Sequence, residues 1–226
     1  MRVLDLFCGA GGAAMGLHWA WPHAEITGVD IVPMPRYPFN FILANAMTFP
    51  LEGYDFIWAS PPCQFYSRTQ HRKNAGIIYP DLIGPIRARI APTKTLYCIE
   101  NVTGARKWLR QPYLLCGGMF ALGVVRHRLF ETNFPMVIPP HQCNSKRVDV
   151  YLVSVTQHGP SARWYRRNPG RRFNVKIWHD AMGIDWMTRE TLTQAIPPAY
   201  SEFIAKQVPS LLITDFTCQG KRGGVD

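Results

Sequence analysis

The residue in this sequence best suited to covalent chemistry is a cysteine that follows two prolines. Residues 61–64 read Pro-Pro-Cys-Gln, so the prolines restrict the backbone directly before Cys63. A nucleophile needs such placement, because a displacement of about 1 Å can lower a rate about 100-fold. It also needs the thiolate form, which nearby Arg126 and Arg128 would favour if the fold brings them close. Cys63 is therefore a candidate nucleophile, and the alternative is a buried structural cysteine.

A glycine-rich turn near the start of the sequence is typical of a nucleotide-type cofactor site. Gly9, Gly11 and Ala14 fit the loose dinucleotide fingerprint, and Asp30 lies sixteen residues beyond Ala14. Glycines let the backbone approach a cofactor closely, and an acid can accept hydrogen bonds from ribose hydroxyls. The pattern does not separate NAD from S-adenosylmethionine, and its alternative is a structural tight turn.

A third candidate group is the carboxylate of Glu100, which directly follows the apolar residues 96–99. An acid at the end of a strand can hydrogen-bond to, or protonate, a ring nitrogen of a bound base. The alternative is a glutamate that caps a helix or forms a salt bridge.

The elements that must position these groups follow from the apolar runs. The sequence predicts strands over residues 3–7, 25–31, 54–59 and 95–99. It predicts a helix over residues 13–21, which Pro22 ends. Apolar strands separated by helix-length stretches are typical of an α/β fold whose parallel sheet is buried on both faces. Ligands of such sheets bind beyond the carboxyl ends of the strands, where Asp30, Cys63 and Glu100 fall.

Charge is distributed unevenly along the chain, whose formal net charge is +10. Residues 1–60 carry a net charge of −3, residues 61–178 carry +15 and residues 179–226 carry −2. A basic middle predicts a phosphate-rich partner, and the alternative is a merely soluble basic surface. The densest basic and aromatic cluster follows a predicted strand at residues 151–158, and its arginines are Arg163, Arg166, Arg167, Arg171 and Arg172.

Composition narrows the class of protein. At 226 residues, with 47% hydrophobic residues, the chain fits one to two globular domains. No apolar run approaches the ~18 residues that a membrane span needs, and the first residues lack signal-peptide features. The six cysteines lack the CxxC or CxxH spacing of zinc sites or a disulfide framework, and we expect Cys98 and Cys116 to be buried structural residues. These features predict a cytoplasmic, thiol-reduced protein without a metal.

Four motifs together resemble those of the DNA (cytosine-5) methyltransferase family. They are residues 5–12, Asp-Leu-Phe-Cys-Gly-Ala-Gly-Gly; residues 61–64; residues 100–102, Glu-Asn-Val; and residues 126–128, Arg-His-Arg. Their order and approximate spacing match the family from residue 5 to about 134 and again from about 182 to 207. The resemblance implies a compact, phage-like member with a Rossmann-like S-adenosylmethionine-dependent methyltransferase fold and a mostly parallel sheet.

The same resemblance implies a division of the chain. Residues 1–134 and 182–216 would form the catalytic domain, and residues 135–181 a small basic target-recognition region. The polar, glycine-rich residues 217–226 are expected to be a frayed tail. Residues 199–208 would form a helix that packs beside the first strand.

The resemblance also assigns catalytic roles. Cys63 would add to C6 of a cytosine flipped out of the duplex, which is required because the base stack blocks this attack. Glu100 would bond to the N3/N4 edge of the base, and Arg128, in one motif with Arg126, would reach its O2 side. C5 becomes carbanion-like and takes the sulfonium methyl group. Loss of the C5 proton then eliminates the thiol.

Cofactor and DNA contacts are implied in the same way. The cofactor would be S-adenosylmethionine, leaving S-adenosylhomocysteine, and its predicted contacts are Asp5, Phe7, Gly9, Gly11, Gly12, Asp30, Ile31, Asn45, Ala46, Pro62 and Gln194. The partner would be double-stranded DNA. Besides the arginine cluster, the predicted contacts are Gln64, Ser67, Arg68, Arg72 and Lys73, at the start of a segment resembling the family's mobile loop. The protein would act as a monomer in a bacterial or phage-infected cell.

The sequence departs from the family pattern in several places. Val124 stands where the arginine motif has glutamine, Asn45 where an aspartate contacts the adenine, and Gln194 where the last motif has asparagine. About forty residues remain for target recognition. Three alternatives therefore stay open: a tRNA cytosine-C5 methyltransferase, a catalytically inactive DNA-binding homologue and an NAD oxidoreductase. The last leaves residues 61–64, residues 100–102 and the basic middle unexplained.

Overall fold

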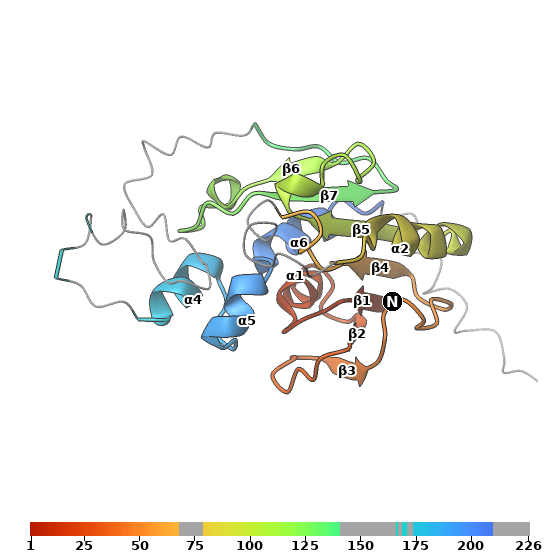
Figure 1. The fold of residues 1–226 in the computed structure, drawn as a ribbon, viewed down its shortest axis with the longest axis horizontal. Coiled ribbons are helices and arrows are strands. Elements are labelled where there is room, and N and C mark those ends of the chain that lie inside the picture. Colours follow the sequence, from red (N-terminus) through yellow and green to blue (C-terminus); the bar gives the residue numbers. More distant parts are fainter. Residues whose placement is uncertain (68–78, 141–165, 167–168, 171–173, 210–226) are drawn as a thin grey trace, which may run out of the picture.

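A computed structural model describes residues 1–67, 79–140, 166, 169–170 and 174–209. Its described strands form one seven-stranded sheet in the order β3-β2-β1-β4-β5-β7-β6 (Figure 1). The strands are β1 Arg2–Leu6, β2 Glu25–Asp30, β3 Asn40–Leu43, β4 Phe56–Ala59, β5 Leu96–Asn101, β6 Tyr113–Leu115 and β7 Arg128–Thr132. β1 to β5 pair in parallel, and β7 runs antiparallel to both of its neighbours, β5 and β6.

Helices cover both faces of this sheet. They are α1 Gly12–Ala20, α2 Ile83–Ile90, α4 Lys176–Met182, α5 Arg189–Gln194 and α6 Pro198–Ala205, with 3-10 turns at Ala91–Thr93, Thr103–Ala105 and Gly117–Phe120. Neighbouring strand residues point to opposite faces. Val3 therefore packs in the cluster that contains α1 and α6, whereas Leu4 packs in the cluster that contains α2. The sheet is buried on both sides, as its continuous apolar strands predict.

α1 and α6 approach each other unusually closely, and glycines make this approach feasible. A Cβ atom at Gly16 would lie 1.9 Å from the carbonyl oxygen of Pro198, and one at Gly12 would lie 2.3 Å from that of Ile196. The Ser201 hydroxyl donates a 2.8 Å hydrogen bond to the carbonyl of Ala13. The predicted helix at residues 199–208 is confirmed as α6, which packs against α1 and shares a buried cluster with Val3 of β1.

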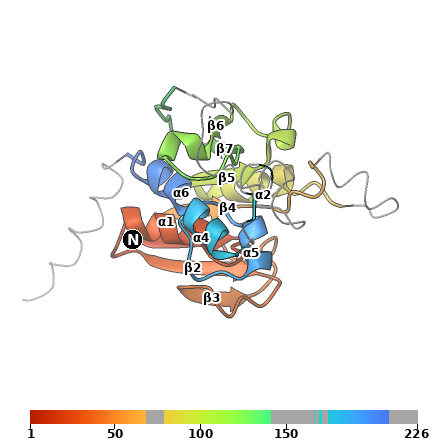
Figure 2. The same ribbon diagram turned by 90° about the vertical axis from the view of Figure 1, so that its left-hand side faces the viewer.

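The two short helices α4 and α5 lie side by side at the end of the sheet to which the parallel strands point (Figures 1 and 2). Trp178 and Met182 of α4 and Leu192 of α5 are buried in one cluster with Ala10 of the glycine turn. The predicted domain boundary between residues 181 and 182 falls inside α4. α4 and α5 therefore cover the edge of the sheet at which the parallel strands end.

The predicted fold class and the four predicted strands are confirmed, as β1, β2, β4 and β5, and the predicted first helix is α1. β3, β6 and β7 were not predicted from the sequence. The predicted strand at residues 151–158, most of the target-recognition region and the tail at 217–226 lie outside the described residues. Within the described part of the chain, no helix is long and apolar enough to cross a membrane.

Candidate functional site

A cavity of about 580 Å³ opens where the carboxyl ends of the parallel strands meet α5. This volume is within the range of about 300–1,000 Å³ that is usual for small-molecule sites. The predicted site residues in its wall are Phe7, Gly9, Gly12, Asp30, Ile31, Asn45, Ala46, Pro62, Cys63, Gln64, Glu100, Arg128 and Gln194. The structure thus brings the proposed nucleophile, acid and glycine turn together in one cavity.

The glycine turn combines positive φ angles with open space. Phe7, Gly9 and Gly11 have φ angles of 56°, 50° and 83°, in the left-handed region that favours glycine. A Cβ atom at Gly9 would meet nothing within 4 Å, so a ligand has room above this residue. Gly11 is not in the wall, because its Cα faces Pro38, whose Cδ would lie 2.7 Å from an added Cβ. Gly9 therefore leaves space for a ligand, and Gly11 allows Tyr37 and Pro38 to pack closely against the turn.

Asp30 connects this turn to the end of β2. Its Oδ2 accepts a 3.0 Å hydrogen bond from the N–H of Gly9, and its Oδ1 accepts one of 3.0 Å from Val32. A carboxylate offers about four lone-pair sites, so two remain for ribose hydroxyls. The indole N–H of Trp186 donates to the carbonyl of Ala10 at 2.9 Å and fixes the other side of the turn. Open Gly9 and the acceptor pair of Asp30 fit a nucleoside cofactor.

Asp5, predicted to contact the cofactor, instead lies beneath the glycine turn. It is only 1% exposed and is not in the cavity wall. Its Oδ2 accepts a hydrogen bond from the Tyr37 hydroxyl at 3.2 Å, and its Oδ1 has no hydrogen-bond partner among the described residues. Burial raises the pKa of the Asp5 carboxyl to about 8. Asp5 thus lies outside the cavity wall and is bonded to Tyr37, whose ring lies against Gly11.

The backbone around Cys63 is held from two directions. The carbonyl of Cys63 accepts 3.0 Å hydrogen bonds from the N–H groups of Tyr66 and Ser67. The carbonyl of Pro61 accepts one of 2.8 Å from Nδ2 of Asn101, at the end of β5. These contacts fix the start and the end of the turn, so the thiol between them has a defined position in the cavity wall.

Tyr66 adds a side-chain anchor that the sequence analysis missed. Its hydroxyl donates to Oδ1 of Asp81 and accepts 3.0 Å hydrogen bonds from the N–H groups of Leu82 and Ile83. The start of α2 is thereby tied to the Cys63 turn. An aspartate just before an apolar helix is a recognisable start signal, but its tyrosine partner is visible only in the fold.

Burial decides the protonation of the Cys63 thiol. It raises the pKa above the ordinary value of 9.0, Arg128 lowers it, Glu100 raises it and Arg126 lowers it by less than Arg128 does. Both arginines are therefore close to the thiol, as expected. Their effect does not outweigh burial, so the free thiol is protonated at neutral pH.

Glu100 and Arg128 form an ion pair in the cavity wall. Nε of Arg128 lies 3.1 Å from Oε1 of Glu100, whose side chain is 7% exposed. Glu100 belongs to β5 itself, because this strand extends to Asn101. Burial raises the pKa of Glu100, while Arg128, Arg126 and a hydrogen bond from Ser60 lower it. A carboxyl with a raised pKa is suited to hold a proton for a ring nitrogen.

Arg126, predicted to be catalytic, lies behind the wall. Its Nη2 donates to the carbonyl of Thr193 at 2.8 Å, and its own carbonyl accepts from the Tyr200 hydroxyl. Burial lowers the pKa of its guanidinium to about 9. Arg126 joins α5 and α6 to the strand that carries Arg128. Val124, one of the family departures, is buried at 3% exposure and packs against Gly117.

The predicted DNA contacts are only partly described. Gln64 lines the cavity, and its buried Oε1 has no hydrogen-bond partner among the described residues. Ser67 is half-buried outside the wall, and Arg166 is exposed. The predicted contacts outside the described residues are Arg68, Arg72, Lys73, Arg163, Arg167, Arg171 and Arg172.

The remaining wall residues were not among the predicted site residues, although Cys8, Ala10, Pro61 and Val102 lie within the motifs described above. They are Cys8, Ala10, Ala13, Val32, Met34, Met47, Ser60, Pro61, Leu82, Val102, Glu190, Thr191, Ala195 and Ile196. Cys98 and Cys116 are buried as predicted. The described ranges contain no group of three or more His, Cys, Asp or Glu side chains arranged to hold a metal ion.

Comparison with known proteins gives likeness in structure but not in sequence. No family model and no curated protein matches the chain. The Schizosaccharomyces pombe Dnmt2 methyltransferase is similar in structure, with 15% identity, a TM-score of 0.57, and coverage of 96% of this chain and 99% of that one. The Entamoeba histolytica methyltransferase EhMeth is similar at 14% identity and a TM-score of 0.61, with coverage of 96% and 98%.

A mutant of Spodoptera frugiperda DNMT2 is similar at 20% identity and a TM-score of 0.43. Its alignment covers 62% of this chain and 53% of that one, so the chain spans about half the length of that structure. The two alignments over almost the whole chain confirm the predicted Rossmann-like fold, which this chain shares with methyltransferases.

Proposed function

We propose that this protein transfers a methyl group from S-adenosylmethionine to C5 of a cytosine in DNA, through a covalent bond between Cys63 and C6. One observation carries the proposal: Cys63, Glu100 and Arg128 share a cavity wall with the open glycine turn and Asp30. An NAD oxidoreductase would use the turn and Asp30 but would leave the cysteine, the acid and the arginine without a role.

The cofactor half of the cavity has the residues that S-adenosylmethionine needs. Gly9 leaves space for it, Asp30 retains free acceptor sites for its ribose, and Ile31, Asn45 and Gln194 form the surrounding wall. The bound cofactor supplies an electrophilic methyl group. Asn45 and Gln194, which depart from the family pattern, both lie in this wall. We therefore expect them to change the affinity for the cofactor.

The substrate half of the cavity provides the protein's share of the chemistry. Cys63 gives up its proton to solvent and bonds to C6 of the extruded base. Glu100, whose pKa burial raises, donates its proton to N3 and so favours negative charge at C5. Arg128, whose Nε lies 3.1 Å from Oε1 of Glu100, stabilises the carboxylate that this proton transfer leaves. Once C5 is methylated, its proton is lost to solvent, the C6–S bond breaks to release the Cys63 thiolate, and N3 returns its proton to Glu100.

Methyl incorporation from labelled S-adenosylmethionine into purified macromolecules tests the proposal. Duplex DNA is expected to accept label, and Cys63→Ala is expected to abolish incorporation while cofactor binding, measured by calorimetry, persists. Cys98→Ala is the matched control, because Cys98 is a buried cysteine outside the cavity wall. Incorporation into tRNA but not into duplex DNA would show that the substrate is RNA and not DNA. An active Cys63→Ala variant would contradict covalent catalysis by Cys63.

A further inference from the structure

Every carboxylate between residues 79 and 134 has an ion-pair or hydrogen-bond partner within the protein. Residues 79–134 contain eight Lys or Arg and three Asp or Glu. Each carboxylate has an internal partner: Glu131 is paired with Arg87, Glu100 with Arg128, and Asp81 with the Tyr66 hydroxyl. No acid of this region is left to neutralise the remaining cations.

Four of those cations are exposed. Arg89 donates to the carbonyls of Ala46 and Phe49, and Arg126 is buried. The exposed cations without an ion pair among the described residues are Lys94, Arg106, Lys107 and Arg110. They do not lie in one place, because Lys94 precedes β5 whereas the other three follow it.

The loop that carries Arg106 and Lys107 lies against the Cys63 turn. A Cβ atom at Gly104 would lie 2.2 Å from the carbonyl oxygen of Tyr66. The ring of Trp108 packs 5.5 Å from that of Phe65 and 5.1 Å from that of Tyr66, between ring centroids. Nζ of Lys107 lies 4.2 Å from the ring centroid of Trp108. These contacts place the two cations beside the segment that follows the proposed nucleophile.

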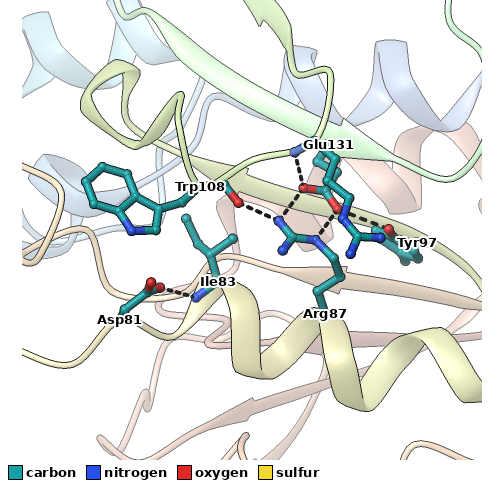
Figure 3. A network of polar contacts seen from close by, with 7 residues as sticks. Asp81, Ile83, Arg87, Tyr97, Trp108 and Glu131 are labelled. Carbon is teal, nitrogen blue, oxygen red and sulfur yellow. Dashed lines mark hydrogen bonds and ion pairs between the residues drawn. The ribbon is translucent and has the colours of Figure 1, made fainter.

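A buried network holds this loop (Figure 3). Nε and Nη2 of Arg87 each donate to Glu131 at 2.6 Å, and Nη2 also donates to the carbonyl of Trp108 at 2.6 Å. The N–H of Arg110 donates to Oε2 of Glu131 at 2.7 Å, and the Tyr97 hydroxyl donates to Oε1 at 3.1 Å. The loop backbone is therefore fixed at residues 108 and 110 before any ligand arrives, which lowers the ordering cost of binding.

We propose that Arg106 and Lys107 form a preordered phosphate-binding edge that holds the nucleic-acid backbone beside the cavity. The inference rests on the proposed function, because it takes the substrate to be a nucleic acid. Phosphate oxygens accept from Arg and Lys without regard to base sequence, so the edge positions the substrate and carries no specificity. The Cys63 turn would then meet a strand that is already anchored on one side.

Duplex binding, followed by fluorescence anisotropy of a labelled DNA between about 50 and 200 mM salt, tests the edge. Each lost phosphate contact is expected to reduce the log–log salt slope by about 0.9. The variant Arg106→Gln/Lys107→Gln should therefore lose about 1.8 of the slope and bind up to about 60-fold more weakly near 0.1 M salt. The matched control is Lys94→Gln/Lys206→Gln, which removes the same formal charge elsewhere and should keep the wild-type slope.

Two outcomes separate this inference from the proposed function. If the wild-type protein methylates DNA while the edge variant keeps the wild-type slope and affinity, the edge is wrong and the enzyme assignment stands. If the wild-type protein binds DNA with the expected loss in the edge variant but transfers no methyl group, the edge stands and the proposed function fails. An equal loss in the control variant would also overturn the edge, because net charge alone would explain it.

Discussion

Two buried carboxylates on neighbouring strands, each paired with an arginine, have very different surroundings. Glu131 on β7 accepts two hydrogen bonds from Arg87, one from the Tyr97 hydroxyl and one from the N–H of Arg110. Glu100 on β5 has the Arg128 ion pair and a hydrogen bond from Ser60, and it faces the cavity. The first carboxylate is saturated by the fold, whereas the second keeps capacity for a ligand.

This difference assigns Glu131 a role in stabilising the fold and Glu100 a role in the proposed reaction. A buried ion pair by itself contributes little net stability, but removal of one partner leaves an uncompensated charge. At Glu131 that charge would remain in the protein interior, beside the loop that carries the cationic edge. At Glu100 the consequence falls on the reaction. The same Glu→Gln substitution should therefore mainly slow the reaction at position 100 and mainly lower the stability of the fold at position 131.

Glu100→Gln should give the largest effect, a fall in methyl transfer of about 100- to 10,000-fold, the range typical of a lost general acid. The amide keeps the shape of the side chain but cannot deliver a proton to the base. Single-turnover methyl transfer measures the rate, and urea unfolding should show a smaller loss of stability than in Glu131→Gln, because Arg128 lies in the cavity wall. A variant with near-wild-type turnover would show that the Glu100 carboxyl does not act in the reaction.

Glu131→Gln should instead destabilise the fold by about 3–5 kcal/mol, because it leaves the Arg87 guanidinium uncompensated. Urea denaturation measures this loss. Methyl transfer by the fraction that remains folded should fall far less than in Glu100→Gln. Equal loss of stability in both variants would remove the distinction between the two carboxylates.

The pH dependence of kcat/KM should sharpen the comparison further. The active form requires a Cys63 thiolate, favoured by high pH, and a protonated Glu100, favoured by low pH, and burial raises both pKa values. Between the two pKa values these demands cancel, so the wild-type profile should be nearly flat. In Glu100→Gln only the thiol titrates, so the residual rate should rise about tenfold per pH unit through the neutral range. A flat profile for this variant would contradict the assigned roles.

Tyr66→Phe should have the smallest effect, because it removes one hydroxyl from the anchor between the Cys63 turn and α2. We expect a loss of about 1 kcal/mol in unfolding free energy, together with a few-fold fall in kcat. Tyr54→Phe is the control, since the Tyr54 hydroxyl makes no hydrogen bond among the described residues. Equal effects of the two substitutions would show that the Tyr66 hydroxyl does not position the turn.

The sequence was informative where one local pattern determines one element. Continuous apolar runs predicted β1, β2, β4 and β5, and the ends of those strands correctly placed Asp30, Cys63 and Glu100 in one cavity. β6 is too short for a periodic signal, since it has three residues.

Contacts between distant segments were not predictable in this way. The network around Glu131 combines residues from α2, β5, β7 and the loop after β5, and no spacing along the chain signals it. Arg126 was placed in the active site with Arg128, yet its side chain lies outside the cavity wall and donates to the carbonyl of Thr193, a contact between distant segments. Burial, which raises the pKa of Cys63 despite two nearby arginines, is likewise a property of the fold.

Covalent trapping tests the central claim most directly. Duplex DNA in which 5-fluorocytosine replaces cytosine is incubated with the protein and S-adenosylmethionine, and the products are analysed by denaturing electrophoresis and peptide mass spectrometry. Fluorine cannot leave C5 as a proton, so the account predicts a stable protein–DNA adduct whose attachment maps to Cys63 and which persists in Cys98→Ala. An enzyme that methylates normal DNA but yields no adduct, or an adduct at another residue, would contradict attack by Cys63.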